Sequence, residues 1–125
     1  MNDAVIRLLL ILIAATTAVT GFAQLVAPAW VLAFIAPSFD ALGAHFFATV
    51  GMFMVITGAM FLQSLLRRSP EPAIPFWIAV QKGAAAALVA WAVIRGLLAP
   101  LAYAVAAFDA VTAVITFVFW YRLPR

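Results

Sequence analysis

The chain contains no cysteine and only one histidine, and these absences exclude several classes of site. Without thiols there are no disulfides, thiolate metal sites, iron–sulfur clusters or cysteine nucleophiles. The acids and the histidine are too few and too scattered to supply the ligands of a protein-bound metal ion. No Ser-His-Asp arrangement is evident either. We therefore expect that the protein is not an enzyme and that it binds neither a metal ion nor a cofactor. The acids and the histidine are Asp3, Asp40, Glu71, Asp109 and His45.

Charged residues are also scarce, at 9% of the 125 residues, whereas 69% are hydrophobic. Soluble domains carry roughly 25% charged residues, and the mean hydropathy of this chain is +1.21. We predict an all-α integral membrane protein with a single membrane domain over residues 1–125. The formal net charge is +3. In so apolar a chain, we expect the basic residues to set the orientation of the protein in the membrane and not to bind nucleic acid.

Four apolar segments are long enough to cross a bilayer, for which about 20 helical residues are needed. The first also resembles a secretory signal peptide, with Arg7 before the apolar stretch and the small residues Gly21 and Ala23 near its end. Its apolar stretch is long for that role, so we expect a true span. The sequence predicts a four-helix bundle with spans at about 4–26, 41–66, 74–98 and 101–121.

The connections between the spans differ in character. Residues 28–37 are too short to cross the membrane and are bracketed by prolines. Pro28 suits the first turn of a helix and Pro37 ends one, so we expect a short helix lying in the membrane interface with Trp30 at headgroup depth. Residues 67–72 are polar and proline-rich, whereas only residues 99–100 separate the last two spans. These two must be antiparallel neighbours.

The basic residues predict the orientation of the bundle. Cytoplasmic ends of membrane spans carry an excess of arginine and lysine. If both termini share a side, only Arg95 lies at the end of a span on the other side. We therefore expect both termini in the cytoplasm, with the chain in the bacterial inner membrane. The arginines on the side of the termini are Arg7, Arg67, Arg68, Arg122 and Arg125.

Two charges lie inside the apolar spans, Lys82 in the third and Asp109 in the fourth. A rise of 1.5 Å per residue places them roughly 12 Å and 18 Å from the cytoplasmic boundary, an offset within reach of a lysine side chain. Ionised groups at such depth usually have a partner or a task. We predict an intramembrane ion pair that holds the last two helices in register. The alternatives are a proton site, a polar ligand contact, or a Lys82 that reaches the cytoplasm beside an uncharged Asp109.

Small residues predict where the helices pack closely. Gly51 and Gly58 are seven residues apart on the second span, and Gly83 and Ala87 are four apart on the third. Small side chains let the backbones of membrane helices approach each other. We therefore expect close helix contacts at both places.

A second polar group is expected near the outer face. Gln24 ends a stripe on one face of the first span that begins at Thr17. Together with Asp40, His45 and Arg95, it could line a shallow polar pocket that opens outward. The alternative is that these residues contact headgroups and water. Ligation of a haem or chlorophyll by His45 is a further alternative, but a lone histidine cannot form a bis-histidine site.

The pattern resembles the DoxX-like superfamily of small four-helix bacterial membrane proteins. The similar features are Arg7 opening the first span, the proline-bounded segment 28–37, the glycines of the second span, the Lys82-Gly83 pair, and Asp109. Some relatives are accessory subunits of quinone-linked oxidoreductases. The resemblance therefore implies an accessory membrane subunit.

Two functions are compatible with these features. The first is an accessory or structural subunit of a larger membrane complex, such as a quinone-linked respiratory one, in contact with lipid and with other membrane subunits or further copies of itself. The alternative is a small binding or transport protein for a lipophilic molecule such as a quinone or a lipid. An enzyme ranks last, since the chain offers only isolated acid–base groups.

Overall fold

The computed structural model describes residues 1–125 and contains five helices and no strand. The four long helices are apolar and long enough to cross a membrane, and they confirm the predicted all-α four-helix membrane bundle. The short α2 lies between the first two of them. The helices are α1 (Asp3–Val26), α2 (Pro28–Leu32), α3 (Ala41–Leu65), α4 (Ala73–Ile94) and α5 (Ala102–Arg122).

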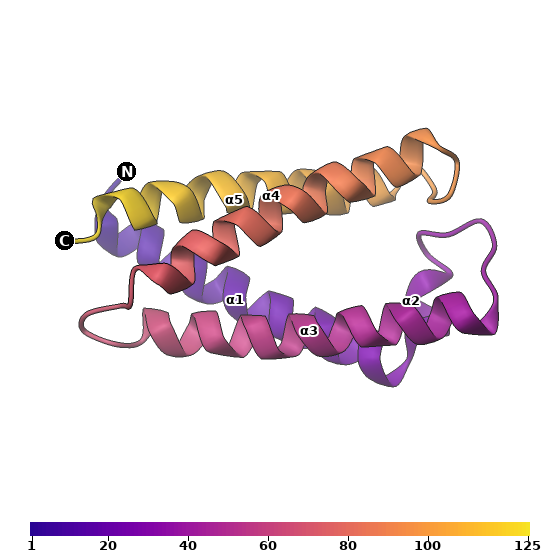
Figure 1. Cartoon of the computed structure of the whole chain (residues 1–125), viewed down its shortest axis with the longest axis horizontal. Helices are drawn as coiled ribbons and strands as arrows, with labels where there is room; N and C mark the ends of the chain where they lie inside the picture. The colour runs from indigo at the N-terminus through magenta and orange to yellow at the C-terminus, as the bar shows by residue number, and fades with distance from the viewer.

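The long helices form two antiparallel hairpins (Figure 1). α1 packs mainly against α3, and α4 packs mainly against α5, whereas fewer contacts join the two hairpins. We call α1 with α3 the first hairpin and α4 with α5 the second hairpin. Both chain termini and the α3–α4 connection lie at one end of the bundle, which we call the terminal end (Figure 1). The α2–α3 and α4–α5 connections lie at the opposite end.

The first hairpin is closed by glycine contacts, as the sequence predicts for the second span. A Cβ atom on Gly51 would lie 2.6 Å from the carbonyl oxygen of Gly21, and one on Gly58 would lie 3.0 Å from the backbone nitrogen of Ala18. Only glycine allows the two backbones to come this close. The contact predicted at Gly83 is less close, because a Cβ there would meet only the Cβ of Ala113, at an ordinary 3.9 Å.

The two hairpins meet in an apolar core near the terminal end. The core joins seven buried residues from all four long helices: Ile6, Leu10, Ala14, Phe61, Leu65, Ile78 and Phe119. Every buried residue of α4 lies in its first half, between Pro75 and Lys82, and none lies between Gly83 and Ile94. Beyond Lys82, the α4 residues that face the bundle are only half-buried.

The segment between the first two spans is less helical than predicted. The helix expected over 28–37 ends at Leu32, and Phe34 and Ile35 donate backbone hydrogen bonds to residues three positions earlier. These tighter bonds turn the chain before Pro37 instead of extending the helix. The carbonyl of Ile35 accepts a bond of 2.7 Å from Ala99 N, so this segment is tied to the α4–α5 connection.

The third span also ends earlier than predicted, at Ile94 rather than at residue 98. Gly96 follows with a φ of +74°, a conformation that suits glycine. Its N–H bonds to the Val93 carbonyl, and the Leu97 N–H bonds to the Ala92 carbonyl. These are the two hydrogen bonds of a Schellman motif, which terminates the helix.

Candidate functional site

The polar centre of the bundle is built around Lys82. Its Nζ lies 3.1 Å from Asp109 Oδ1 and donates a second hydrogen bond of 3.2 Å to Thr17 Oγ1. The Lys82 and Asp109 residues are only 6% and 9% exposed. The two charges that the sequence places at matching depths are thus in contact inside the bundle.

Lys82 also links the two hairpins, which the sequence does not predict. Thr17 belongs to α1 of the first hairpin, whereas Lys82 and Asp109 belong to α4 and α5 of the second. Thr17 lies on the buried face of α1, in register with Leu10, Ala14 and Gly21. The sequence assigns Thr17 only to the stripe that leads to Gln24. The position of Thr17 near the middle of the first span is the sequence feature that could have indicated its contact with Lys82.

The buried stripe of α5 extends the polar centre toward the terminal end. Asp109, Thr112 and Thr116 recur at the three- and four-residue spacing of one helix face. Thr112 is 1% exposed and Thr116 is 0% exposed, and neither hydroxyl has a hydrogen-bond partner in the protein. The Ser64 hydroxyl on α3 is likewise buried and unpartnered.

A small crevice of about 10 Å³ opens beside Lys82 between the hairpins. Its polar lining includes the exposed Gln81 of α4 and the hydroxyl-bearing Thr57 of α3. Half of its ten lining residues are polar. The polar residues around it are Thr17, Thr57, Gln81, Lys82 and Thr112. The crevice is far smaller than a ligand pocket, which occupies about 300–1,000 Å³.

The four residues predicted for the outer pocket have different surroundings in the structure. Gln24 is buried between α1 and α3, where its Nε2 donates a bond of 3.3 Å to the Phe47 carbonyl. The Asp40 side chain caps α3 by accepting a bond of 2.7 Å from Gly43 N.

His45 and Arg95, the other two predicted members, are exposed. The Arg95 guanidinium lies 5.1 Å from the centre of the Trp91 ring on its own helix. No hydrogen bond joins any two of the four side chains, and the Gln24 amide is directed to α3.

Arg7 has a structural role that the sequence did not reveal. Its Nε donates a hydrogen bond of 2.7 Å to the Leu65 carbonyl, and its Nη2 donates to the Arg67 carbonyl. Carbonyls in the last turn of a helix have no partner within the helix, and a basic group near them is favourable. Arg7 of α1 thus completes the end of α3 and fixes the first hairpin at the terminal end.

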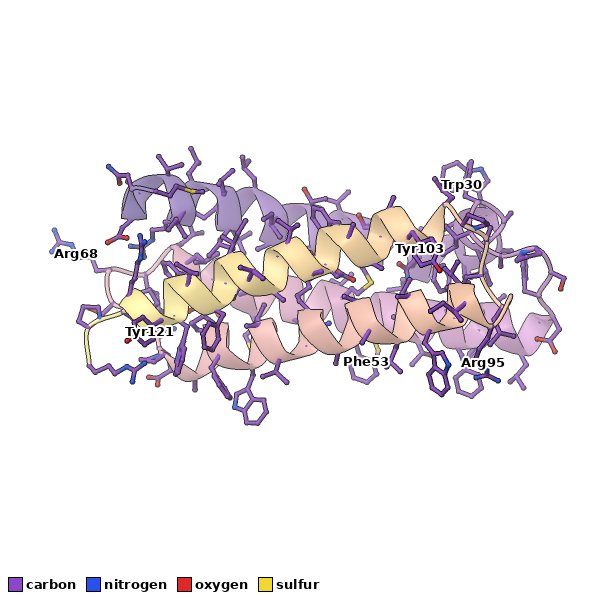
Figure 2. The ribbon with its side chains drawn as sticks, turned by 90° about the horizontal axis from the view of Figure 1, so that it is seen from above. Trp30, Phe53, Arg68, Arg95, Tyr103 and Tyr121 are labelled. Carbon is purple, nitrogen blue, oxygen red and sulfur yellow. The ribbon has the colours of Figure 1, made fainter.

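Arginine and aromatic side chains lie at both ends of the bundle. Arg68 and Tyr121 lie at the terminal end, whereas Trp30 and Arg95 lie at the opposite end (Figure 2). At the terminal end, Arg122 Nη1 lies 3.1 Å from Asp3 Oδ1 and ties the two ends of the chain together. This second ion pair is largely exposed, in contrast to the buried Lys82–Asp109 pair.

The arrangement offers charge pairing and hydrogen bonding but no assembled nucleophile. The hydroxyls near the centre belong to threonines with no histidine beside them, and His45 lies elsewhere. No group of three or more His, Cys, Asp or Glu side chains is placed to hold a metal ion. Comparisons of the chain with protein-family models, curated proteins and solved structures find no match. The physical features of the bundle itself therefore carry the functional argument.

Proposed function

We propose that this protein is an accessory integral membrane subunit that packs against another membrane protein in a larger complex, and that it is not an enzyme. The observation that carries the proposal is the exposed apolar face of the second hairpin. α4 has no buried residue from Gly83 to Ile94, although this half of the helix is rich in alanine. Small residues at a membrane helix surface allow a second helix to approach closely.

The same face carries an apolar groove of about 330 Å³ between α4 and α5. Ala79 and Ala113 are its small lining residues, and Phe76 and Phe117 are its aromatic ones. A transmembrane helix of a partner subunit fits this combination, since its side chains could enter the groove and contact the alanines. The resemblance to the DoxX-like superfamily favours a quinone-linked respiratory complex as the assembly.

Filling the groove should release the partner. Val114 lines the groove and is 65% exposed, so Val114→Trp should leave the fold intact while blocking the groove. We expect the tagged variant to lose a subunit that copurifies with the wild-type protein from native membranes in mild detergent. Val19→Trp is the matched control, because Val19 is 70% exposed on α1, in the first hairpin. A wild-type protein that purifies alone as a monodisperse species contradicts the proposal.

The groove also favours a second candidate function, the binding or transport of a lipophilic molecule such as a quinone or a lipid. Its volume lies at the lower end of the range of ligand pockets, and its lining is wholly apolar. Native mass spectrometry separates the two functions. A retained small molecule that Val114→Trp displaces, with no copurifying subunit, supports this second function and contradicts the first.

We further propose that the bundle lies in the bacterial inner membrane with both termini in the cytoplasm. The support is the concentration of arginines at the terminal end, with only Arg95 at the opposite end of a span. Green fluorescent protein fused to the C-terminus should therefore fluoresce. Alkaline phosphatase inserted after Gly96, in the α4–α5 connection, should be active. The reverse pattern contradicts this orientation.

A further inference from the structure

The polar centre has hydrogen-bonding capacity that the protein does not use. A lysine ammonium has three N–H donors, and Lys82 uses two of them, toward Thr17 and Asp109. Nearby, the buried Thr112 hydroxyl has no partner. Lys82 and Thr112 both line the crevice of about 10 Å³. An unpaired buried donor and an unpaired buried hydroxyl thus share one small space.

Three other threonines show how a hydroxyl in these helices can be satisfied by its own helix. Thr16, Thr49 and Thr57 each donate their hydroxyl to the carbonyl four residues earlier on their own helix. That bond satisfies a hydroxyl in a membrane helix without any other partner. Thr112 and Thr116 do not form it, and Thr17 instead accepts from Lys82. The Thr112 hydroxyl is therefore available to a group inside the crevice.

We infer that the crevice binds one water molecule, which accepts a hydrogen bond from the third N–H of Lys82 and bonds to the Thr112 hydroxyl. A water needs about 10–15 Å³ and two to four polar partners, and the crevice meets both conditions. It is too small for the ring of a lipophilic ligand. The bound water accepts the third Lys82 hydrogen bond, so the buried ion pair is in contact with one water molecule.

The effect of a Thr112→Val substitution on stability shows whether the Thr112 hydroxyl is bonded to water or has no partner. If water satisfies Thr112, Thr112→Val removes a hydrogen bond and should lower the ratio of folded to unfolded protein by about fivefold. Thr116 is the matched control, because it is also buried and unpartnered but does not line the crevice. Thr116→Val should leave the ratio unchanged or raise it, and Thr112→Ser should retain stability relative to Thr112→Val. Equal, neutral results for both valine variants overturn the inference.

A direct measurement uses the fact that Lys82 is the only lysine in the chain. Protein labelled with ¹⁵N at lysine Nζ gives a single side-chain signal that needs no assignment. In lipid bilayers, water-edited solid-state NMR should show rapid transfer of magnetisation from water protons to this nitrogen. We expect the transfer to weaken in Thr112→Val and to persist in Thr116→Val. An Nζ signal that receives no magnetisation from water, or receives it only from lipid protons, overturns the inference.

Discussion

Replacing Asp109 with leucine should lower the free energy of unfolding by about 3–5 kcal/mol, because it leaves a buried ammonium without its counter-ion. Lys82 is 6% exposed and has no other acid within salt-bridge distance. Its remaining hydrogen-bond partner, the Thr17 hydroxyl, is neutral, as is the Phe108 ring 5.9 Å from Nζ. Unfolding in mixed micelles with increasing denaturing detergent measures the loss.

Two further variants separate charge from hydrogen bonding. Asp109→Asn keeps an oxygen that can accept from Lys82 but removes the charge, so we expect a smaller loss than for leucine. Asp3→Leu removes the acid of the exposed pair with Arg122. Exposed ion pairs contribute up to about 1 kcal/mol, so this variant should change stability little. Similar losses for Asp3→Leu and Asp109→Leu would show that burial of the central pair has no special role.

Gly51→Ala should be the second severe substitution, with a loss of about 3 kcal/mol. The added Cβ would lie 2.6 Å from the carbonyl oxygen of Gly21 and 2.8 Å from the backbone nitrogen of Leu25. Backbone atoms cannot rotate out of the way, so α1 and α3 would have to separate along much of their length. The same detergent unfolding experiment detects the loss.

Gly83→Ala is the matched control for this substitution. Gly83 also lies inside a long helix, but a Cβ there would make only an ordinary contact with Ala113. Alanine has a higher helix propensity than glycine, so Gly83→Ala should be neutral or stabilising. A loss as large as that of Gly51→Ala would contradict this explanation, because Gly83 has no close backbone neighbour that an added Cβ could displace.

The sequence predicts the spans well because the physical signal is local. Apolar length and the prolines at 28 and 37 require no knowledge of neighbouring helices. The errors occur where backbone hydrogen bonding decides. The Schellman bonds at Gly96 end α4 before the apolar run is complete, and tight turns end α2 at Leu32. Neither feature alters the hydropathy of the sequence, so the hydropathy pattern cannot predict where α2 and α4 end.

The candidate site is predictable within one hairpin but not between hairpins. The short α4–α5 connection sets the relative depth of Lys82 and Asp109, and the structure brings the two together. How the first hairpin docks on the second depends on side-chain packing along four helices. For this reason the bond from Lys82 to Thr17 was missed. Burial of Gln24 against α3 depends on helix packing in the same way.

These features suit a subunit whose internal polar groups serve its own fold. Lys82, with Asp109 and Thr17, joins three of the four long helices, and Arg7 and Arg122 connect helices at the terminal end. These charged side chains are therefore bonded to other groups of the chain. The surface that we propose for a partner is the exposed apolar face of the second hairpin, which includes the groove near Phe76.

The most direct test of this account is the stability of the double variant with Lys82→Met and Asp109→Leu. Each single substitution strands one buried charge, whereas the double variant removes both and leaves apolar side chains of similar volume. We expect the double variant to be far more stable than the sum of the single losses predicts, and close to the wild type. Strictly additive losses would contradict the account, because they would show that Lys82 and Asp109 do not stabilise the bundle as a pair.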